Sequence, residues 1–461
     1  MAKPPVVNPP LPVEHDPYVL TAHAVQDPPT TLRGTLKYLG PGFLLSAAIV
    51  GSGELIATTT LGARAGFVTL WVILVSCLVK VALQLEFGKH VIHSGESTMA
   101  SLNQLPGPKF RGANWSIWGW LFIQLFKLLQ VGGIIGGVAI TLNIALPFLS
   151  VPVWAVVVKI ANSLLISRNY YNFIETFSLV MIGLFTLFTL ASLFFLQFTE
   201  YALTWDNVAS GLQFTLPPAA IGVAIAAFGI TGVGGDEIMY YNYWCLEKGY
   251  AAYTGPRDDS PAWRARAKGW IRVMYLDALL AMVVYTIVTA AFYLLGAAVL
   301  HAQGLVPEGY EMIETLSGMY TGTLGPWAKS VFIVCALVVL YSTVFAATAS
   351  WTRIFTDAFA QLCLLDFYDR TARRRMFAKL AWIFPAIWCV LFLFIQLPVL
   401  MILLGGFMTS VLLLLVVYAA FHFRYRRLPL SLKPSLFYDI AFWLSGLAIL
   451  MVGVYGVYKL F

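Results

Sequence analysis

Two short segments that combine glycine with an acid interrupt long apolar stretches of the chain. Residues 50–54 read Val-Gly-Ser-Gly-Glu, and residues 233–237 read Val-Gly-Gly-Asp-Glu. Glycines free the backbone from helical hydrogen bonding and acids are costly in a bilayer, so irregular backbone at membrane depth persists only where it lines a site. A matched pair of such breaks, one in each half of a chain, is typical of a carrier's binding site. We therefore predict a membrane carrier whose substrate lies between Glu54 and the pair formed by Asp236 and Glu237.

The composition independently indicates a membrane protein. Of the 461 residues, 59% are hydrophobic and only 11% are charged, which leaves too little polar surface for a soluble protein of this length. The net charge of +7 does not indicate a nucleic-acid partner, because the basic residues gather in short loops between apolar stretches. The five cysteines occur singly, without the spacing of a metal site or a disulfide framework, and we interpret them as small core residues.

The apolar stretches predict about eleven membrane-spanning helices, since a helix needs roughly 20 residues to cross the hydrocarbon. These spans cover residues 39–61, 70–91, 117–146, 151–166, 173–195, 219–244, 271–300, 327–359, 380–394, 399–421 and 437–458. Residues 1–35 are rich in proline and weakly periodic, so we predict that they form a disordered cytoplasmic tail.

The charges of the loops predict how these helices are oriented. The loops after the sixth, eighth and tenth spans are basic, whereas the loop after the seventh span carries Glu308, Glu311 and Glu314. Because loops rich in lysine and arginine stay in the cytoplasm, this alternation puts the N-terminus inside and the C-terminus outside. We expect an integral protein of a bacterial inner (plasma) membrane, which works in the lipid bilayer as a monomer.

The two breaks fall in the first and sixth spans, which predicts an internal repeat. The repeats are five-helix units at residues 36–200 and 217–423, followed by an extra helix at 435–461. An odd number of helices in each repeat inverts the second relative to the first, so the breaks face each other near mid-membrane. Three carboxylates there favour a cation, and hard divalent ions prefer oxygen ligands. The predicted metal ligands are Glu54, Glu237, Asp236, Ser52 and Thr231, with the carbonyls around Gly51 and Gly232.

The first two spans resemble the Nramp family of divalent-metal transporters. Residues 39–43 (Leu-Gly-Pro-Gly-Phe), the break at 51–54, residues 62–67 (Gly-Ala-Arg-Ala-Gly-Phe) and residues 70–72 (Leu-Trp-Val) follow the family's first two helices in order and spacing. The resemblance implies an all-α polytopic membrane protein with the leucine-transporter-type fold of two inverted five-helix repeats. It also implies transport of a divalent metal cation, which many members of the family couple to protons.

The chain departs from the family at the residues that carry the chemistry. The family's Asp-Pro-Gly-Asn in the first helix is replaced by residues 51–54, and its Met-Pro-His in the sixth helix by residues 233–235. Loss of the thioether removes a reason to prefer iron or manganese over magnesium or calcium. We expect a divalent cation of the magnesium or manganese type. The family's acidic pair in the third span falls at Gln130 and Gly133, which carry no protons, so we do not expect proton coupling by the usual route.

Other charged and aromatic residues of the spans leave alternatives open. Asp236 can instead cap the second half of the broken helix. Lys127, one turn before Gln130, would stand in for a bound cation if it faced the site, whereas we interpret Lys80 as a structural charge that snorkels or pairs. The aromatic run at residues 240–244 is interpreted as an interfacial belt.

Two other functions fit the same pattern of helices. The substrate could be a small organic solute, whose amine would meet Glu54 and whose anionic end would meet a half-helix N-terminus. The chain could also be an ion sensor that binds without transporting. We predict no catalytic residues and no cofactor, so the chain is not expected to be an enzyme, and it has no phosphate loop for ATP-driven transport.

Overall fold

The computed structural model describes residues 16–51, 53–167 and 171–460. This part of the chain is helical apart from one short antiparallel hairpin, and eight of its helical segments are long and apolar enough to cross a membrane, with two shorter apolar helices beside them. Each predicted span coincides with a helix or with the two halves of a broken helix. Outside the two broken spans, the elements in chain order are α1 (Leu32–Leu36), α4 (Leu70–Ser94), α5 (Thr98–Leu102), β1 (Lys109–Phe110), β2 (Ala113–Asn114), α6 (Trp115–Ala145), α7 (Val151–Ser167), α8 (Tyr171–Phe195), α9 (Trp205–Ser210), α12 (Tyr250–Thr254), α13 (Pro261–Leu295), α14 (Met312–Leu324), α15 (Ala328–Gln361), α16 (Arg370–Ile395), α17 (Pro398–His422) and α18 (Leu436–Leu460).

The first span is interrupted where the glycines predicted a break. It consists of α2 (Pro41–Ile49), a π-helical turn η2 (Gly53–Thr58) and α3 (Thr59–Ala65). The start of α2 is held by Asp277 of α13, whose carboxylate accepts hydrogen bonds from the backbone N–H groups of Gly40 (2.9 Å) and Gly42 (2.5 Å). A carboxylate at this position satisfies two of the amides that a helix leaves unpaired at its N-terminus.

The sixth span is also broken. Helix α10 (Ile221–Ile230) ends at an extended Thr231, and α11 (Gly235–Lys248) begins four residues later. Between them Gly232 has a φ of +66°, a left-handed conformation that favours glycine. The ends of both half-helices therefore leave carbonyl and amide groups inside the bundle that have no partner within the helix.

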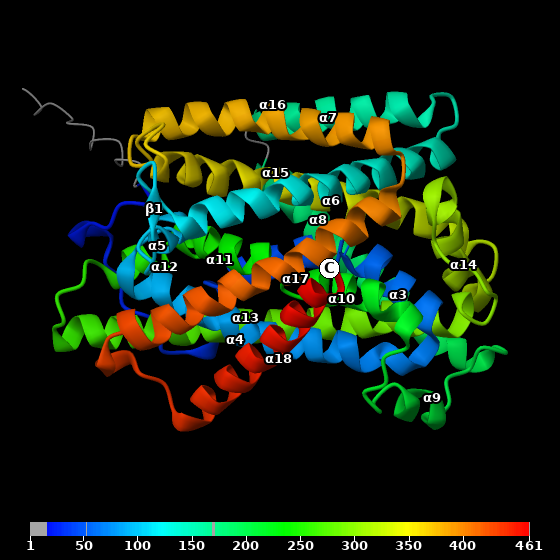
Figure 1. The fold of residues 1–461 in the computed structure, drawn as a ribbon, viewed down its shortest axis with the longest axis horizontal. Helices are drawn as coiled ribbons and strands as arrows, with labels where there is room; N and C mark the ends of the chain where they lie inside the picture. Colours follow the sequence, from blue (N-terminus) through cyan, green and yellow to red (C-terminus); the bar gives the residue numbers. More distant parts are fainter. Residues whose placement is uncertain (1–15, 52, 168–170, 461) are drawn as a thin grey trace, which may run out of the picture.

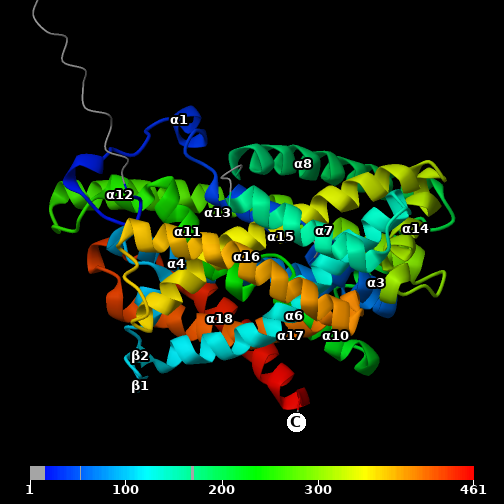
Figure 2. The same ribbon diagram turned by 90° about the horizontal axis from the view of Figure 1, so that it is seen from above.

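Most of the long helices run lengthwise in one bundle (Figures 1 and 2). Helix α12 and the hairpin lie at one end, and α3 and α14 lie at the other. The loops after α11, α15 and α17, which carry the basic clusters, all lie at the end with α12. The grouping of the basic loops is as the sequence predicts, and the side of the membrane they face stays a prediction.

Residues 16–35 differ from the disordered tail expected for this stretch. Tyr18 is buried, and its hydroxyl donates to Glu247 at the end of α11 (2.5 Å). Asp16 forms an ion pair with Arg373 of α16 (2.6 Å), and the indole of Trp270 donates to the carbonyl of Gln26 (3.0 Å). These contacts are with distant parts of the chain, so the local composition gave no sign of them. The earlier part of the predicted tail, residues 1–15, lies outside the described residues.

Candidate functional site

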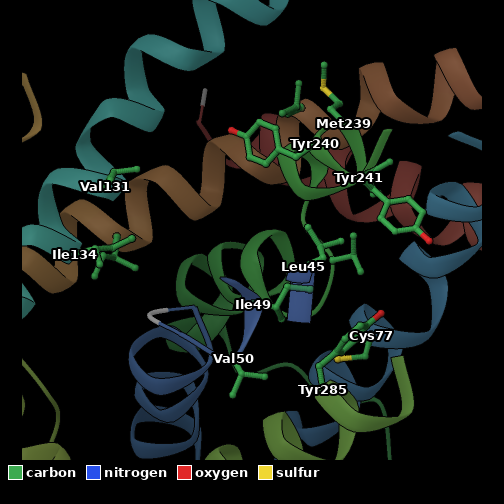
Figure 3. Close-up of a cluster of buried hydrophobic side chains, with 14 of the residues drawn as sticks. Leu45, Ile49, Val50, Cys77, Val131, Ile134, Met239, Tyr240, Tyr241 and Tyr285 are labelled. Carbon is green, nitrogen blue, oxygen red and sulfur yellow. The ribbon is translucent and has the colours of Figure 1, made fainter. Parts of the chain in front are cut away.

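A cavity of about 60 Å³ lies among α2, α6, α11 and α15, beside the start of α11. Its polar lining consists of Lys127, Gln130, Asp236, Glu237, Tyr240, Thr343 and Ser350, and its apolar lining includes Leu45, Val131, Ile134, Trp244 and Trp351. Figure 3 shows Leu45 of α2 below Tyr240 of α11, with Val131 and Ile134 of α6 to the left of both. The cavity is thus bounded by the first half of the first span and the second half of the sixth.

Asp236 is held by two side chains of α6. Its carboxylate forms an ion pair with Lys127 (Nζ to Oδ2, 2.8 Å) and accepts a hydrogen bond from the amide of Gln124 (Nε2 to Oδ1, 2.8 Å). Lys127 also donates to the hydroxyl of Thr409 on α17 (2.5 Å). Asp236 does not cap α11, whose N-cap position is Gly234 without a side-chain hydrogen bond. Lys127 does face the site, but its charge is shared with Asp236.

Glu237 is the less buried of the two acids in the first turn of α11, and it lines the cavity. Its carboxylate folds back toward the start of the helix, where a Cβ added at Gly234 would lie 2.4 Å from Glu237 Oε2. A carboxylate at a helix N-terminus is stabilised by the positive end of the helix dipole. Gly234 therefore provides the space in which the Glu237 carboxylate lies.

Glu54 lies in the break of the first span and is completely buried. Its Oε1 accepts a hydrogen bond from the backbone N–H of Gly232 (2.8 Å), and its Oε2 accepts one from the hydroxyl of Thr58 (3.1 Å). The Thr58 hydroxyl lies 3.0 Å from the hydroxyl of Thr231. In this structure Glu54 therefore joins the two broken spans through hydrogen bonds within the protein.

A lysine that we interpreted from the sequence as a structural charge lies at the break of the sixth span. Lys80 of α4 is fully buried, and its ammonium donates to the carbonyls of Phe228 (2.7 Å) and Thr231 at the end of α10. The signal for it was present in the sequence, because a charge in the middle of an apolar span defaults to a functional role. What the sequence did not reveal was its partner, which lies about 150 residues away.

The predicted site residues thus fall into two groups. Asp236 and Glu237 line the cavity, whereas Glu54, Thr231 and Gly232 form a hydrogen-bonded network at the joint between the broken spans. Gly51 is buried in the first break, and Ser52 lies outside the described residues. Within the described ranges no cluster of three or more His, Cys, Asp or Glu side chains is placed to hold a metal ion. The ligand set stays a prediction.

The interpretation of residues 240–244 as an interfacial belt is wrong. Tyr241 and Tyr243 are buried, and their hydroxyls donate to Asp277 (3.1 Å) and Asp357 (2.6 Å). Tyr240 and Trp244 are also buried and line the cavity. The run follows a helix that passes through the interior, so its aromatic rings pack against protein rather than against lipid headgroups.

Gln130 and Gly133 are the two positions of the third span at which the sequence resemblance put the family's acidic pair. Gln130 lines the cavity, and Gly133 packs against α17, where an added Cβ would lie 2.6 Å from the backbone oxygen of Pro398. Close packing of glycine against a neighbouring backbone is a common feature of membrane helices. The space at Gly133 therefore excludes an acidic side chain in this arrangement.

Comparison with known proteins identifies the family. A family model described as natural resistance-associated macrophage protein-like matches residues 42–459. A divalent metal cation transporter MntH of Xanthomonas campestris pv. campestris is 26% identical over 344 residues, which cover 74% of this chain and 72% of that protein. The leucine-transporter-type fold is shared by two solved structures. One is a manganese transporter of Eremococcus coleocola (TM-score 0.66, 16% identity, 94% of this chain and 89% of that one). The other is Mhp1, a nucleobase-cation-symport-1 family transporter, in a closed conformation (TM-score 0.57, 15% identity, 91% and 92%). The chain is an integral membrane protein and belongs to the natural resistance-associated macrophage protein (Nramp) family.

Proposed function

We propose that the chain is a secondary transporter that moves a divalent metal cation across a membrane by alternating access. Family membership and the names of the bacterial relatives support the class of substrate. The observation that carries the proposal is the small central cavity into which the carboxylate-bearing start of α11 faces. An acid beside a cavity inside a membrane bundle is a functional site by default.

The volume of the cavity favours an ion over an organic solute. At about 60 Å³ it has room for about four waters, because one water needs roughly 10–15 Å³ of such space. Pockets that take organic ligands are usually about 300–1,000 Å³. A single ion that keeps some of its water fits this volume.

The chemistry of the lining favours a hard cation. Apart from the Lys127 ammonium and the Trp244 and Trp351 indoles, its polar groups offer oxygens from carboxylates, hydroxyls and the Gln130 side chain, and no methionine or cysteine lines the described cavity. Magnesium keeps several waters and is bound through one or two carboxylates, which matches Glu237 with Asp236 beside it. We therefore propose magnesium or manganese as the substrate, with Glu237 as the principal ligand and Asp236 as the second.

Glu54 has a different role in this proposal. Because its carboxylate is used by Gly232 and Thr58, we assign it to positioning the joint between the two broken spans. The sequence also predicted that the ion is coordinated directly by Glu54, Ser52, Thr231 and the carbonyls of Gly51 and Gly232. That part of the ligand set stays a prediction.

We propose further that transport is not coupled to protons by the family's usual route. Gln130 does not titrate, and the packing at Gly133 leaves no space for an acid. The cation would then follow its own electrochemical gradient. The test is a proteoliposome loaded with a pH-sensitive dye at zero membrane potential. Internal acidification that follows the cation dose and is absent from protein-free liposomes would show proton cotransport and contradict this part of the proposal.

The transport function is tested with the purified full chain in proteoliposomes that contain a divalent-ion indicator. We expect saturable entry of magnesium or manganese, and competition between the two ions. Glu308→Gln is the matched control, because Glu308 is an exposed acid paired with Arg64 at 2.8 Å. Entry no faster than in protein-free liposomes for magnesium, manganese, calcium and iron alike would refute transport.

We also propose that the chain works as a monomer in the bacterial plasma membrane, because the cavity is built from one chain. Its orientation in that membrane, with the basic loops in the cytoplasm, is a separate proposal. Cys363 follows α15 at the basic end and is exposed, whereas the other four cysteines are buried. A membrane-impermeant maleimide should therefore label Cys363 only after the membrane is permeabilised. Labelling in intact cells would put the basic loops outside and contradict the orientation.

A further inference from the structure

The backbone carbonyls at the end of α10 bind a positively charged side chain of the same chain. A helix that ends inside the bundle leaves its last carbonyls without partners, and these carry the negative end of the helix dipole. At the end of α10 the carbonyls of Phe228, Gly229 and Thr231 all point to one group, the ammonium of Lys80.

The geometry around Lys80 is that of a coordinated ion. Its Nζ lies 2.7 Å from the Phe228 oxygen and 3.4 Å from the Gly229 oxygen, and it also donates to Thr231. The hydroxyl of Ser76, one turn earlier on α4, donates to the same two carbonyls of Phe228 (2.9 Å) and Thr231 (3.0 Å). Lys80 is fully buried, and its ammonium donates to backbone carbonyls.

The three carbonyls around Lys80, here called the cradle, are joined to Glu54 through hydrogen bonds. Its carboxylate binds the backbone N–H of Gly232, the residue that follows Thr231. Its other oxygen is linked through Thr58 to the Thr231 side chain. A ring of carbonyls with a carboxylate behind it is a site for a monovalent cation in a carrier with a broken helix.

We propose that Lys80 is a tethered cation that fills a monovalent-ion site at the break of the sixth span. The ammonium supplies the positive charge that sodium or potassium would supply, so the carrier needs no separate ion to hold the two half-helices together. Removing the side chain opens the cradle, and sodium or potassium then enters it. This inference goes beyond the proposed transport of a divalent ion and does not depend on it.

The experiment is thermal unfolding of the purified full chain, without divalent ions, in sodium, potassium or choline chloride at equal ionic strength. The wild type should unfold at the same temperature in all three salts. Lys80→Ala should unfold at a lower temperature in choline, and sodium or potassium should raise that temperature saturably, by about 4 °C or more once the ion far exceeds its dissociation constant.

Two further variants separate a tethered cation from an ordinary structural lysine. Ser76→Ala removes the other donor to the same carbonyls without opening space for an ion, so its loss of stability should be equal in the three salts. Lys80→Gln keeps a hydrogen-bond donor but removes the charge. We expect it to regain stability with sodium or potassium, though less than Lys80→Ala because its side chain still occupies part of the cradle.

Two results would overturn the proposal. One is a saturable effect of sodium or potassium on the wild type, since its cradle would then not be filled by Lys80. The other is a folded Lys80→Ala with the same unfolding temperature in the three salts. If Lys80→Ala does not fold, the same comparison of the three salts is made with Lys80→Gln, which keeps a hydrogen-bond donor. Because the assay measures unfolding without a divalent ion, failure of the proposed transport would leave its outcome unchanged.

Discussion

The two breaks look alike in the sequence but differ in what surrounds their acids. In the first break the Glu54 carboxylate is completely buried and is bound by a backbone amide and a threonine hydroxyl. In the second break Glu237 is only partly buried and faces a cavity, while Asp236 beside it is paired with Lys127. The first break is therefore held to the second by hydrogen bonds, whereas the second leaves a carboxylate beside a cavity.

Two lysines explain much of this difference. Lys80 neutralises the carbonyl end of α10 beside Glu54, and Lys127 neutralises Asp236 at the start of α11. Buried charges persist only when they are paired or coordinated, so each lysine fixes the role of its neighbours. Among the described contacts, Asp236 forms an ion pair with Lys127, and Glu54 accepts a hydrogen bond from the other break. Glu237 has neither kind of contact. A matched motif thus predicts where the backbone breaks, but the charge partners decide which carboxylate is left without a partner of its own.

The largest effect should come from removing the ion pair between Lys127 and Asp236 at the start of α11. Lys127→Met leaves the Asp236 carboxylate buried without its partner, which should lower the free energy of unfolding by about 3 kcal/mol. The double variant Lys127→Met/Asp236→Asn should regain most of that loss, because no unpaired charge remains. Thermal unfolding in detergent measures both. Equal stability of Lys127→Met and wild type would mean that the second break does not depend on its lysine.

The next effect tests which acid binds the ion. Glu237→Gln should reduce the initial rate of divalent-ion entry about 10- to 100-fold, since an interaction with a charged group contributes about 1.5–3 kcal/mol. Proteoliposome flux measures it, with unfolding temperature as the check that the protein is intact. Glu308→Gln, at an exposed pair, should keep the wild-type rate because such pairs contribute about 0–1 kcal/mol. A full rate from Glu237→Gln would remove Glu237 from the site.

A smaller effect is expected from the glycine that makes room for Glu237. The φ of Gly234 is −75°, which suits alanine, but the added Cβ would lie 2.4 Å from Glu237 Oε2. The carboxylate must then move, and the apparent affinity for the ion should fall about fivefold, which corresponds to about 1 kcal/mol. Gly222→Ala on α10 is the control, because no atom lies within 4 Å of its added Cβ. Equal affinities for the two variants would show that the position of the carboxylate is unimportant.

The smallest effect should be that of Glu54→Gln. The amide oxygen still accepts from Gly232, so the free energy of unfolding should fall by no more than about 1 kcal/mol. Flux should stay within about threefold of wild type, a change worth about 0.7 kcal/mol. Glu54→Ala instead leaves the buried Gly232 amide without a partner and should cost about 1–3 kcal/mol. A loss of flux as large as that of Glu237→Gln would mean that both breaks bind the ion, as the sequence predicted.

Much of the fold follows from local properties of the sequence. The spans are apolar stretches of sufficient length, and the breaks lie at glycines, because helix formation and burial in a bilayer depend on neighbouring residues. The motif at residues 39–72 indicated the family that the match to residues 42–459 establishes. The acids that line the cavity were also singled out from the sequence, since a charge is rare and costly within a span.

The tertiary structure decided which of these residues share a site. The contacts that separate the two breaks join Lys80 to Phe228, Glu54 to Gly232 and Lys127 to Asp236, each between distant parts of the chain. The same holds for Tyr241 and Tyr243, whose acidic partners lie on α13 and α15, and for Tyr18 in a segment that was expected to be disordered. The local sequence shows that a charge is buried at an energetic cost, but it does not show which residue stabilises that charge. That partner comes from a distant part of the chain, and helix packing brings the two together.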